Sequence, residues 1–351
     1  MVKNNNFHFL RFLFALLVVI SHSYPLSGSN ESAQWIYQIT NGQIVWASIG
    51  LNGFFIISGY FIFQSHERSK SIFDYYRKRF LRLFPALFVV LLLSLLLAPF
   101  VYKGAVPFFE NRAVYTYLPN NLVLYNFQSG IKGIFDTNAY HAINGSLWTI
   151  RYEFSLYVAI SFMFFFRKKI NIVRSLLFLA FVILYLSYNF FIERLAGSKI
   201  FGMNGYSILN FGAFFVCGSL LASIRMEQLK YKGLIFLVAI LFFVISVYFN
   251  FYNATKHLSL SLIIIMIGFI PLPFFSTFGK YGDMSYGIYI YCFPIQQTLM
   301  YFFKLDTFAL LFSSVFISII FGYLSWHFIE KEALKYKNGI RIKQKMILQP
   351  N

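Results

Sequence analysis

Residues 7–25 read FHFLRFLFALLVVISHSYP, a nearly continuous apolar stretch with Arg11 near its start and His22 near its end. An α-helix rises about 1.5 Å and turns about 100° per residue, so these side chains would lie roughly 16 Å apart on one helix face. Ionisable groups are costly in hydrocarbon and usually face a bundle interior or a wet cavity. The pair therefore predicts a membrane helix that lines a cavity. For either residue alone, the alternative is that Arg11 extends to the lipid headgroups and His22 caps the other helix end.

The composition of the whole chain indicates a membrane protein. The 351 residues are 58% hydrophobic and only 12% charged, and the mean hydropathy is +0.64, which excludes an ordinary soluble domain. The net charge of +18 comes from short basic clusters between apolar stretches. Such clusters are typical of topology signals, so we do not expect a nucleic-acid partner.

Stretches of about 20 apolar residues are long enough to cross a bilayer. We predict an all-α polytopic membrane bundle of about ten such helices, at residues 7–25, 43–64, 81–101, 145–166, 175–192, 205–224, 233–251, 257–275, 284–302 and 308–328. With the N-terminus in the cytoplasm, 22 of the 30 Lys and Arg residues fall on the inner side. The positive-inside rule therefore places both termini in the cytoplasm. Residues 1–330 would form the membrane domain and 331–351 a basic cytoplasmic tail.

Neither a disulfide nor a metal site is expected, because Cys217 and Cys292 both lie inside apolar stretches. Ser21-His22-Ser23 faintly resembles a signal-peptidase site. Cleavage there would remove the Arg11 and His22 pair, so we expect the first helix to be retained.

A second polar run, NGSLWTIRYEF at residues 144–154, lies at the predicted outer end of the fourth span. Its Glu153 is an intramembrane carboxylate, which would orient a general-base histidine such as His22. The alternative is that Glu153 simply pairs with Arg151 or with another helix. The candidates for substrate binding in this run are Asn144, Ser146 and Trp148. The long outer loop at residues 102–144 would either cover a site or pack as a structural element.

A basic run, YYRKRFLRLFP at residues 75–85, lies where the third span begins on the inner side. Arg77, Arg79 and Arg82 would bind the phosphates of a cytosolic donor through charge-assisted hydrogen bonds. Arg79 and Arg82 would share a helix face. Clusters at the ends of spans also serve topology and anionic lipid, so this run alone is a weak signal.

Two further runs are interpreted first as helix-packing segments. GLNGFFIISGY at residues 50–60 carries small residues that permit close approach of helices. In SYGIYIYCFP at residues 285–294, the proline would free backbone groups and shape a cavity.

Taken in order over residues 7–330, these five pieces resemble the membrane acyltransferase-3 family. The resemblance implies a ten-helix bundle that uses cytoplasmic acyl-CoA, with His22 as the essential histidine, Arg11 as its partner, and Arg79 and Arg82 on the donor side. The chain departs from the family at Cys292, where many members have histidine, and at Arg151, where relatives often have proline. The esterase-like domain that some longer relatives append is absent from the sequence.

The resulting hypothesis is a multi-pass O-acetyltransferase of the bacterial cytoplasmic (inner) membrane. It would move acetyl from acetyl-CoA, a substrate and not a bound cofactor, to a hydroxyl of an O-antigen, capsule or exopolysaccharide. A transient acyl-histidine is the alternative to general-base catalysis. Rival functions are a transporter, an acyltransferase with a non-glycan acceptor such as a metabolite, and a noncatalytic scaffold. Membrane lipids would be partners, and the oligomeric state stays open.

Overall fold

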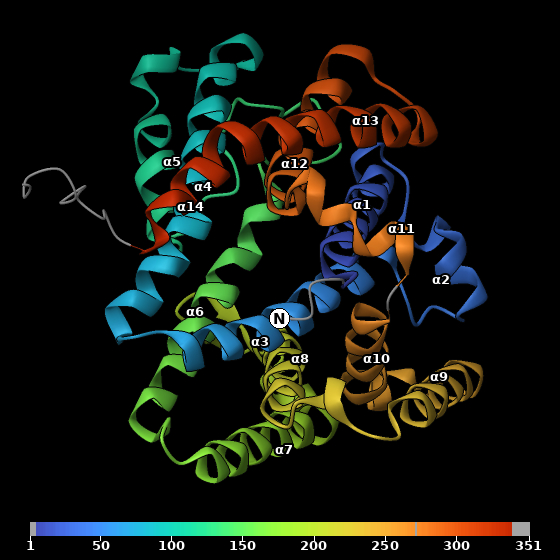
Figure 1. Cartoon of the computed structure of the whole chain (residues 1–351). Helices are drawn as coiled ribbons and strands as arrows, with labels where there is room; N and C mark the ends of the chain where they lie inside the picture. The colour runs from blue at the N-terminus through green and yellow to red at the C-terminus, as the bar shows by residue number, and fades with distance from the viewer. Residues whose placement is uncertain (1–4, 271, 339–351) are drawn as a thin grey trace, which may run out of the picture.

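In the computed structural model, residues 5–270 and 272–338 are described, and most of them are helical (Figure 1). The α-helices are α1 (Phe7–Leu26), α2 (Trp35–Ile39), α3 (Trp46–Arg68), α4 (Ile72–Val101), α5 (Arg112–Val123), α6 (Ile150–Ser161), α7 (Ile170–Leu195), α8 (Gly205–Ser223), α9 (Lys232–Tyr248), α10 (Tyr252–Phe269), α11 (Pro273–Ser276), α12 (Ser285–Phe303), α13 (Thr307–Ser325) and α14 (Lys331–Lys335). Two-residue strands β1 (Lys199–Ile200) and β2 (Met203–Asn204) form one hairpin. The expected all-α class is confirmed.

Each of the ten predicted spans coincides with a helix, but not every helix passes the test of length and hydropathy for a membrane span. In the described part of the chain, seven do so, or eight if α10 and the sharply bent segment after it count as one span. Helix α9 has 17 residues and is slightly short. Helix α12 contains Pro294, Gln296 and Gln297, which lower its hydropathy. It is largely buried, so it is surrounded by neighbouring helices and not by lipid. Membrane helices are therefore confirmed, while the count of ten remains a prediction.

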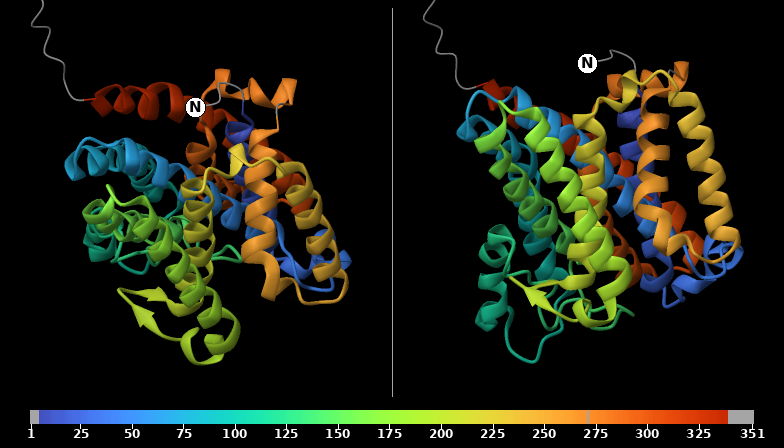
Figure 2. Two further views of the ribbon diagram at one scale, coloured as in Figure 1. Left: turned by 60° about the horizontal axis from the view of Figure 1, so that its bottom comes forward. Right: turned by 90° about the horizontal axis from the view of Figure 1, so that it is seen from below.

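The helix ends gather at two opposite faces of the bundle. The Asn6 side chain donates to the carbonyls of Ile267 and Ile270, which joins the start of α1 to the end of α10. At the other end of α1, the Ser27 and Thr307 hydroxyls are 2.7 Å apart. Figure 2 shows the start of α1 and α14 at one end, which we call the terminal face, and the β-hairpin and α2 at the other.

The backbones of helices α3 and α8 approach each other closely, as the small residues of the run at residues 50–60 predict. A Cβ at Gly59 would lie 2.0 Å from the Phe215 carbonyl oxygen, and a Cβ at Gly218 would lie 2.2 Å from that of Ile56. No larger residue fits at either position without separating the helices. This contact holds α3 in the middle of the bundle, where it forms one wall of the site described below.

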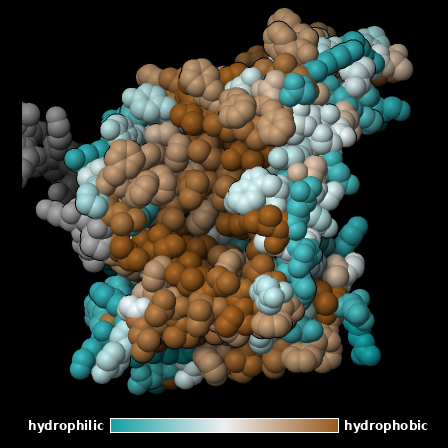
Figure 3. All heavy atoms as spheres, turned by 90° about the vertical axis from the view of Figure 1, so that its right-hand side faces the viewer, coloured by the Kyte–Doolittle hydropathy of each residue, from teal (hydrophilic) through white to brown (hydrophobic). Residues whose placement is uncertain are grey.

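The flank of the bundle is apolar. In Figure 3, apolar side chains cover the middle of the face, and hydrophilic ones gather toward its margins. On α9 and α13, the exposed apolar residues include Leu237, Leu241, Phe312 and Phe316. Exposed patches of this kind mark surfaces that meet a membrane or a partner.

The two segments that the sequence left open are both packed. The loop at residues 102–144 folds onto α12, where Asn138 donates to the backbone and side-chain oxygens of Gln297, both at 3.0 Å. At the C-terminal end, a π-helical turn, Trp326–Glu330, leads from α13 directly into α14, which packs on α4. The tail expected from residue 331 therefore begins as part of the bundle, and residues 339–351 lie outside the described residues.

Candidate active site

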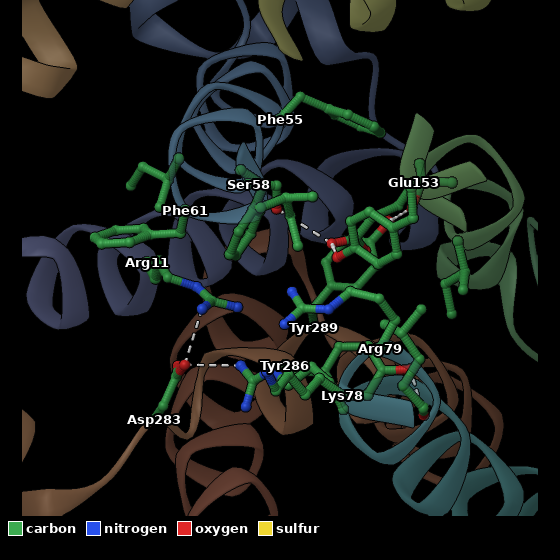
Figure 4. A pocket seen from close by; sticks show the side chains of 18 of the residues that line it. Arg11, Phe55, Ser58, Phe61, Lys78, Arg79, Glu153, Asp283, Tyr286 and Tyr289 are labelled. Carbon is green, nitrogen blue, oxygen red and sulfur yellow. Dashed lines mark hydrogen bonds and ion pairs between the residues drawn. The ribbon is translucent and has the colours of Figure 1, made fainter. Parts of the chain in front are cut away.

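A cavity of about 250 Å³ lies between α1, α3, α4, α6 and α12 (Figure 4). Lys78 and Lys337 border it near the terminal face, and Thr149 and Tyr289 line it in the interior. We call it the first cavity. It brings together Arg11, Arg79, Arg82 and Glu153, which come from three separate runs of the sequence.

Arg11 and Arg82 are held by a shared carboxylate. Asp283, which precedes α12, lies 2.9 Å from Arg11 and 2.7 Å from Arg82, and Glu330 lies 3.2 Å from the second guanidinium nitrogen of Arg82. Burial raises the pKa of Asp283, but Arg11 and Arg82 outweigh this effect and bring that pKa below its usual range. The network joins α1, α4, α12 and the turn after α13, and together these segments form one wall of the first cavity.

Arg79 differs from Arg82 because it forms no ion pair with the described residues. One guanidinium nitrogen donates to Ser65 at 3.1 Å, and the Nε atom is buried with no hydrogen bond in the described part of the chain. The guanidinium lies over the rings of Tyr75 and Tyr157, at 5.8 and 5.7 Å from their centroids. A buried cation with an unused donor, facing a cavity, is suited to bind an anion.

The other members of the basic run behave differently. Arg77 does not line the first cavity; its side chain is 43% exposed and pairs with Asp74 at 3.2 Å. Lys78 lines the cavity and also pairs with Asp74, at 2.6 Å. Burial, followed by the charges of Arg79, Lys78, Arg68 and Arg82, lowers the pKa of Lys337. The opening of the cavity is thus crowded with cations.

Glu153 of α6 also lines the first cavity. Its carboxylate accepts a hydrogen bond from Ser58 at 3.2 Å and another from Tyr157. Arg151 instead lies over the rings of Phe127 and Tyr152, and no ion pair joins it to Glu153 in the described structure. The carboxylate is therefore positioned by two hydroxyls.

His22 lies beyond the inner end of the first cavity and does not line it. Its ring is partly exposed and meets Phe293 edge to face at 5.5 Å, while Nδ1 is buried with no hydrogen bond to a described residue. Phe293 follows the cavity residue Tyr289 by one turn of α12, or about 6 Å of helix. No hydrogen bond or ion pair among the described residues joins His22 to Glu153.

The backbone around His22 is fixed on both sides. Ser21 accepts from Gln34, and Ser23 accepts from Gln296, both at 2.9 Å. Both contacts tether the end of α1 to other segments, so the imidazole is presented from a rigid helix end. An imidazole with a free ring nitrogen is able to accept or donate a proton.

The remaining candidates lie at the 3₁₀ turn that precedes α6, where it packs on α12 and α8. Asn144 caps the 3₁₀ turn Gly145–Thr149 and donates to the Ile290 carbonyl at 2.8 Å. The Ser146 hydroxyl lies 3.7 Å from the Cys292 sulfur, and Trp148 packs against Tyr152 and Phe211. In this structure these side chains hold the helices together, and substrate binding by them remains a proposal.

Sequence reasoning missed four residues of the first cavity and its wall. Asp283 stands two residues before the run at residues 285–294, and Glu330 lies two residues after the last predicted span. An isolated carboxylate at a span end is the signal that would have suggested a partner for Arg82. Ser58 and Tyr157 carried no such signal, because a lone hydroxyl in a span is common.

These features define a multi-pass helical membrane protein with a charged internal cavity. The chain belongs to the acyltransferase-3 family, since its residues 4–327 match that family's acyltransferase domain. It is 26% identical over 344 residues to an O-acetyl transferase of Shigella phage Sf6, which covers 95% of this chain and 97% of that protein. It is also 30% identical over 173 residues to nodulation protein 10 of Rhizobium leguminosarum bv. viciae, covering 44% of this chain and 43% of that protein. No solved structure matches the chain.

Proposed function

We propose that this membrane acyltransferase transfers an acetyl group from cytoplasmic acetyl-CoA to a hydroxyl of a cell-envelope polysaccharide, in the bacterial inner membrane. The observation that carries the proposal is the first cavity, which holds the unpaired Arg79 guanidinium near the terminal face and ends one helical turn from the ring beside His22. The likeness over nearly the full length to a phage O-acetyl transferase supports the acetyl group and the oxygen acceptor.

The donor would enter from the terminal face, taken as cytoplasmic by the positive-inside rule. Arg79 would bind a donor phosphate directly, and Arg82, held by Asp283 and Glu330, would add positive charge to the same wall. Arg11 shares Asp283 with Arg82, so it would position the wall as well as contribute charge. Arg77 would act only at long range, because its side chain pairs with Asp74 outside the cavity.

The acetyl end of the donor would pass Glu153 and Tyr289 toward His22. There His22, as general base, would take the proton of the acceptor hydroxyl while its oxygen attacks the thioester carbonyl. The new C–O bond forms, the C–S bond breaks, and the proton passes from the imidazole to the leaving thiolate. A covalent acyl-histidine would perform the same net transfer in two steps.

The acceptor would approach from the opposite face, where the loop at residues 102–144 and the run with Asn144, Ser146 and Trp148 lie. A polysaccharide repeat of the O-antigen, capsule or exopolysaccharide type has the hydroxyls that this chemistry needs. No resident cofactor takes part in this mechanism, since acetyl-CoA is consumed as a substrate.

The test compares base-labile acetyl on envelope glycans of a deletion strain complemented with wild type, His22→Ala or His141→Ala. His141 is an exposed histidine of the loop and serves as the matched control. We expect wild type and His141→Ala to restore acetylation and His22→Ala to lose at least about 10²-fold of it, the usual contribution of a general base. All three proteins must reach the membrane in equal amounts.

Two results would contradict the proposal. Equal acetylation with His22→Ala would remove His22 from the mechanism. No acetylation with any protein, together with glycan or metabolite flux that is independent of acetyl-CoA, would favour a transporter.

A further inference from the structure

A second, larger cavity opens beside the first one at the terminal face. Its volume is about 900 Å³, and it lies between the ends of α3, α8 and α10 and the starts of α1, α7 and α9. Neither the sequence motifs nor the proposed mechanism uses it. Its charged lining residues are Arg68, Arg174, Arg225, Lys232, Glu67 and Glu227.

The cations of the second cavity outnumber its carboxylates by four to two. None of the four basic side chains forms an ion pair with a described residue. Arg174 donates to the Ser223 carbonyl at 2.8 and 3.1 Å, and Glu227 accepts from the Tyr60 hydroxyl. Four cations and two carboxylates leave a net positive charge around the cavity, which favours a multiply charged anion.

One wall of the second cavity is aromatic. Phe7, Phe61 and Phe269 line it, and the Phe7 ring meets the other two edge to face at 4.8 and 5.0 Å. Flat apolar rings next to guanidinium groups are the chemistry that binds a base and its phosphates together. The lining therefore matches a phosphorylated nucleoside better than an inorganic anion.

The two cavities adjoin at Phe61, labelled in Figure 4, which lines both of them. The first cavity, at about 250 Å³, is smaller than the roughly 300–1,000 Å³ of sites for drug-sized ligands. Coenzyme A is larger than such ligands, so the first cavity holds only part of it. The donor must therefore extend into a neighbouring space.

We propose that the second cavity binds the 3′-phosphoadenosine end of the acyl-CoA donor. This inference rests on the proposed function. The diphosphate lies at Arg79, the pantetheine arm enters the first cavity, and the adenosine with its 3′-phosphate lies across Phe61 against Arg68, Arg174 and Arg225. The second cavity thus decides donor affinity, while the first holds the reacting end.

The experiment uses full-length protein in nanodiscs of zwitterionic lipid and compares acetyl-CoA with 3′-dephospho-acetyl-CoA. Arg225→Gln should raise the KM for acetyl-CoA about tenfold, the effect of one lost charge-assisted hydrogen bond, and leave the KM for the dephospho donor unchanged. Arg225 has a backbone φ of +53°. Glutamine also carries a Cβ, so the exchange leaves the backbone strain at this position unchanged. Lys230→Gln, an exposed cation of the same loop outside the cavity, is the matched control and should change neither KM.

A direct measurement covers the case in which a variant loses activity by misfolding. Adenosine 3′,5′-bisphosphate should bind wild type and Lys230→Gln, compete with acetyl-CoA, and bind Arg225→Gln about tenfold more weakly.

Three outcomes would overturn the inference. If Arg225→Gln raised the KM for both donors equally, or for neither, the second cavity would not bind the 3′-phosphate of the donor. Acetyl-CoA use, and with it the proposed function, would still stand. Displacement of the bisphosphate by added phosphatidylglycerol would assign the cavity to a lipid headgroup. Failure of wild type to use or bind acetyl-CoA would reject the proposed function and this inference together.

Discussion

Arg82 of α4 and Asp283, which precedes α12, form an ion pair of 2.7 Å with side chains only 13% and 7% exposed. Because Asp283 also binds Arg11, Asp283→Asn would leave two guanidinium groups without their shared carboxylate. Removing one member of a buried pair costs about 3–5 kcal/mol. We expect the variant to unfold several degrees below wild type in a thermal scan in detergent.

The control for this variant is Glu332→Gln, which removes the exposed pair with Lys335 and should change the unfolding temperature little. The pH dependence follows from the lowered pKa of Asp283. A carboxylate whose pKa is lower in the folded state stabilises fully above the unfolded value of about 3.9, and the effect is lost only as the pH falls through the folded pKa. Asp283 should therefore stay ionised in the folded protein from pH 8 to pH 5, and Asp283→Asn should be less stable than wild type throughout that range; equal stability of the two proteins would contradict the assigned pair.

Arg79 and Arg77 are two residues apart on α4 but occupy different environments. Arg79→Gln removes a buried, unpaired cation from the first cavity and should raise the KM for acetyl-CoA at least about tenfold. Arg77→Gln removes an equal charge outside the cavity and should change that KM less than about twofold. Titration of each variant with acetyl-CoA gives the two KM values. Equal effects would show that the basic run at residues 75–85 acts only through its total charge.

Glu153→Gln keeps the shape of the side chain and removes its charge. Since Ser58 and Tyr157 hold this carboxylate, we expect turnover to fall by about 10²-fold while the pH profile of the residual activity keeps its shape. Initial rates from pH 5.5 to 9 test both parts. A shift of the acidic limb would instead show that Glu153 acts on His22 during turnover.

Gly59→Ala places a methyl group against the Phe215 carbonyl, where a Cβ would lie at 2.0 Å. The helices α3 and α8 would have to separate, so we expect a lower unfolding temperature and less folded protein in the membrane. Gly233→Ala is the control, because nothing lies within 4 Å of a Cβ at that position of α9. If both variants were equally stable, the close approach of α3 and α8 would not be required.

Much of the fold follows from hydropathy alone. The ten apolar stretches fall on helices because a chain in lipid must satisfy its backbone hydrogen bonds within each segment. Helix α12 shows the limit of that rule, since its Gln296 and Gln297 are fully buried and bonded inside the bundle. Hydropathy measures the cost of facing lipid and carries no information on which helices are surrounded by protein.

The candidate site was predictable only in part. Arg11, Arg79, Arg82 and Glu153 could be singled out because ionisable side chains in apolar stretches are rare. Their partners could not be assigned, because Asp283 is 201 residues from Arg82 along the chain, and spacing says nothing of such contacts. The pairing of Glu153 with Ser58 and Tyr157, and the second cavity, depend on how the helices pack.

The order of the chain also sets the order in which the Arg82 network forms during synthesis. Arg82 precedes Asp283 and Glu330 by 201 and 248 residues. At about 5–20 residues per second, the ribosome needs roughly 10–50 s to reach the two carboxylates after it has passed the arginine. During that time Arg82 lacks both of its carboxylate partners. The charged wall of the first cavity is therefore complete only when synthesis of the described chain is almost finished.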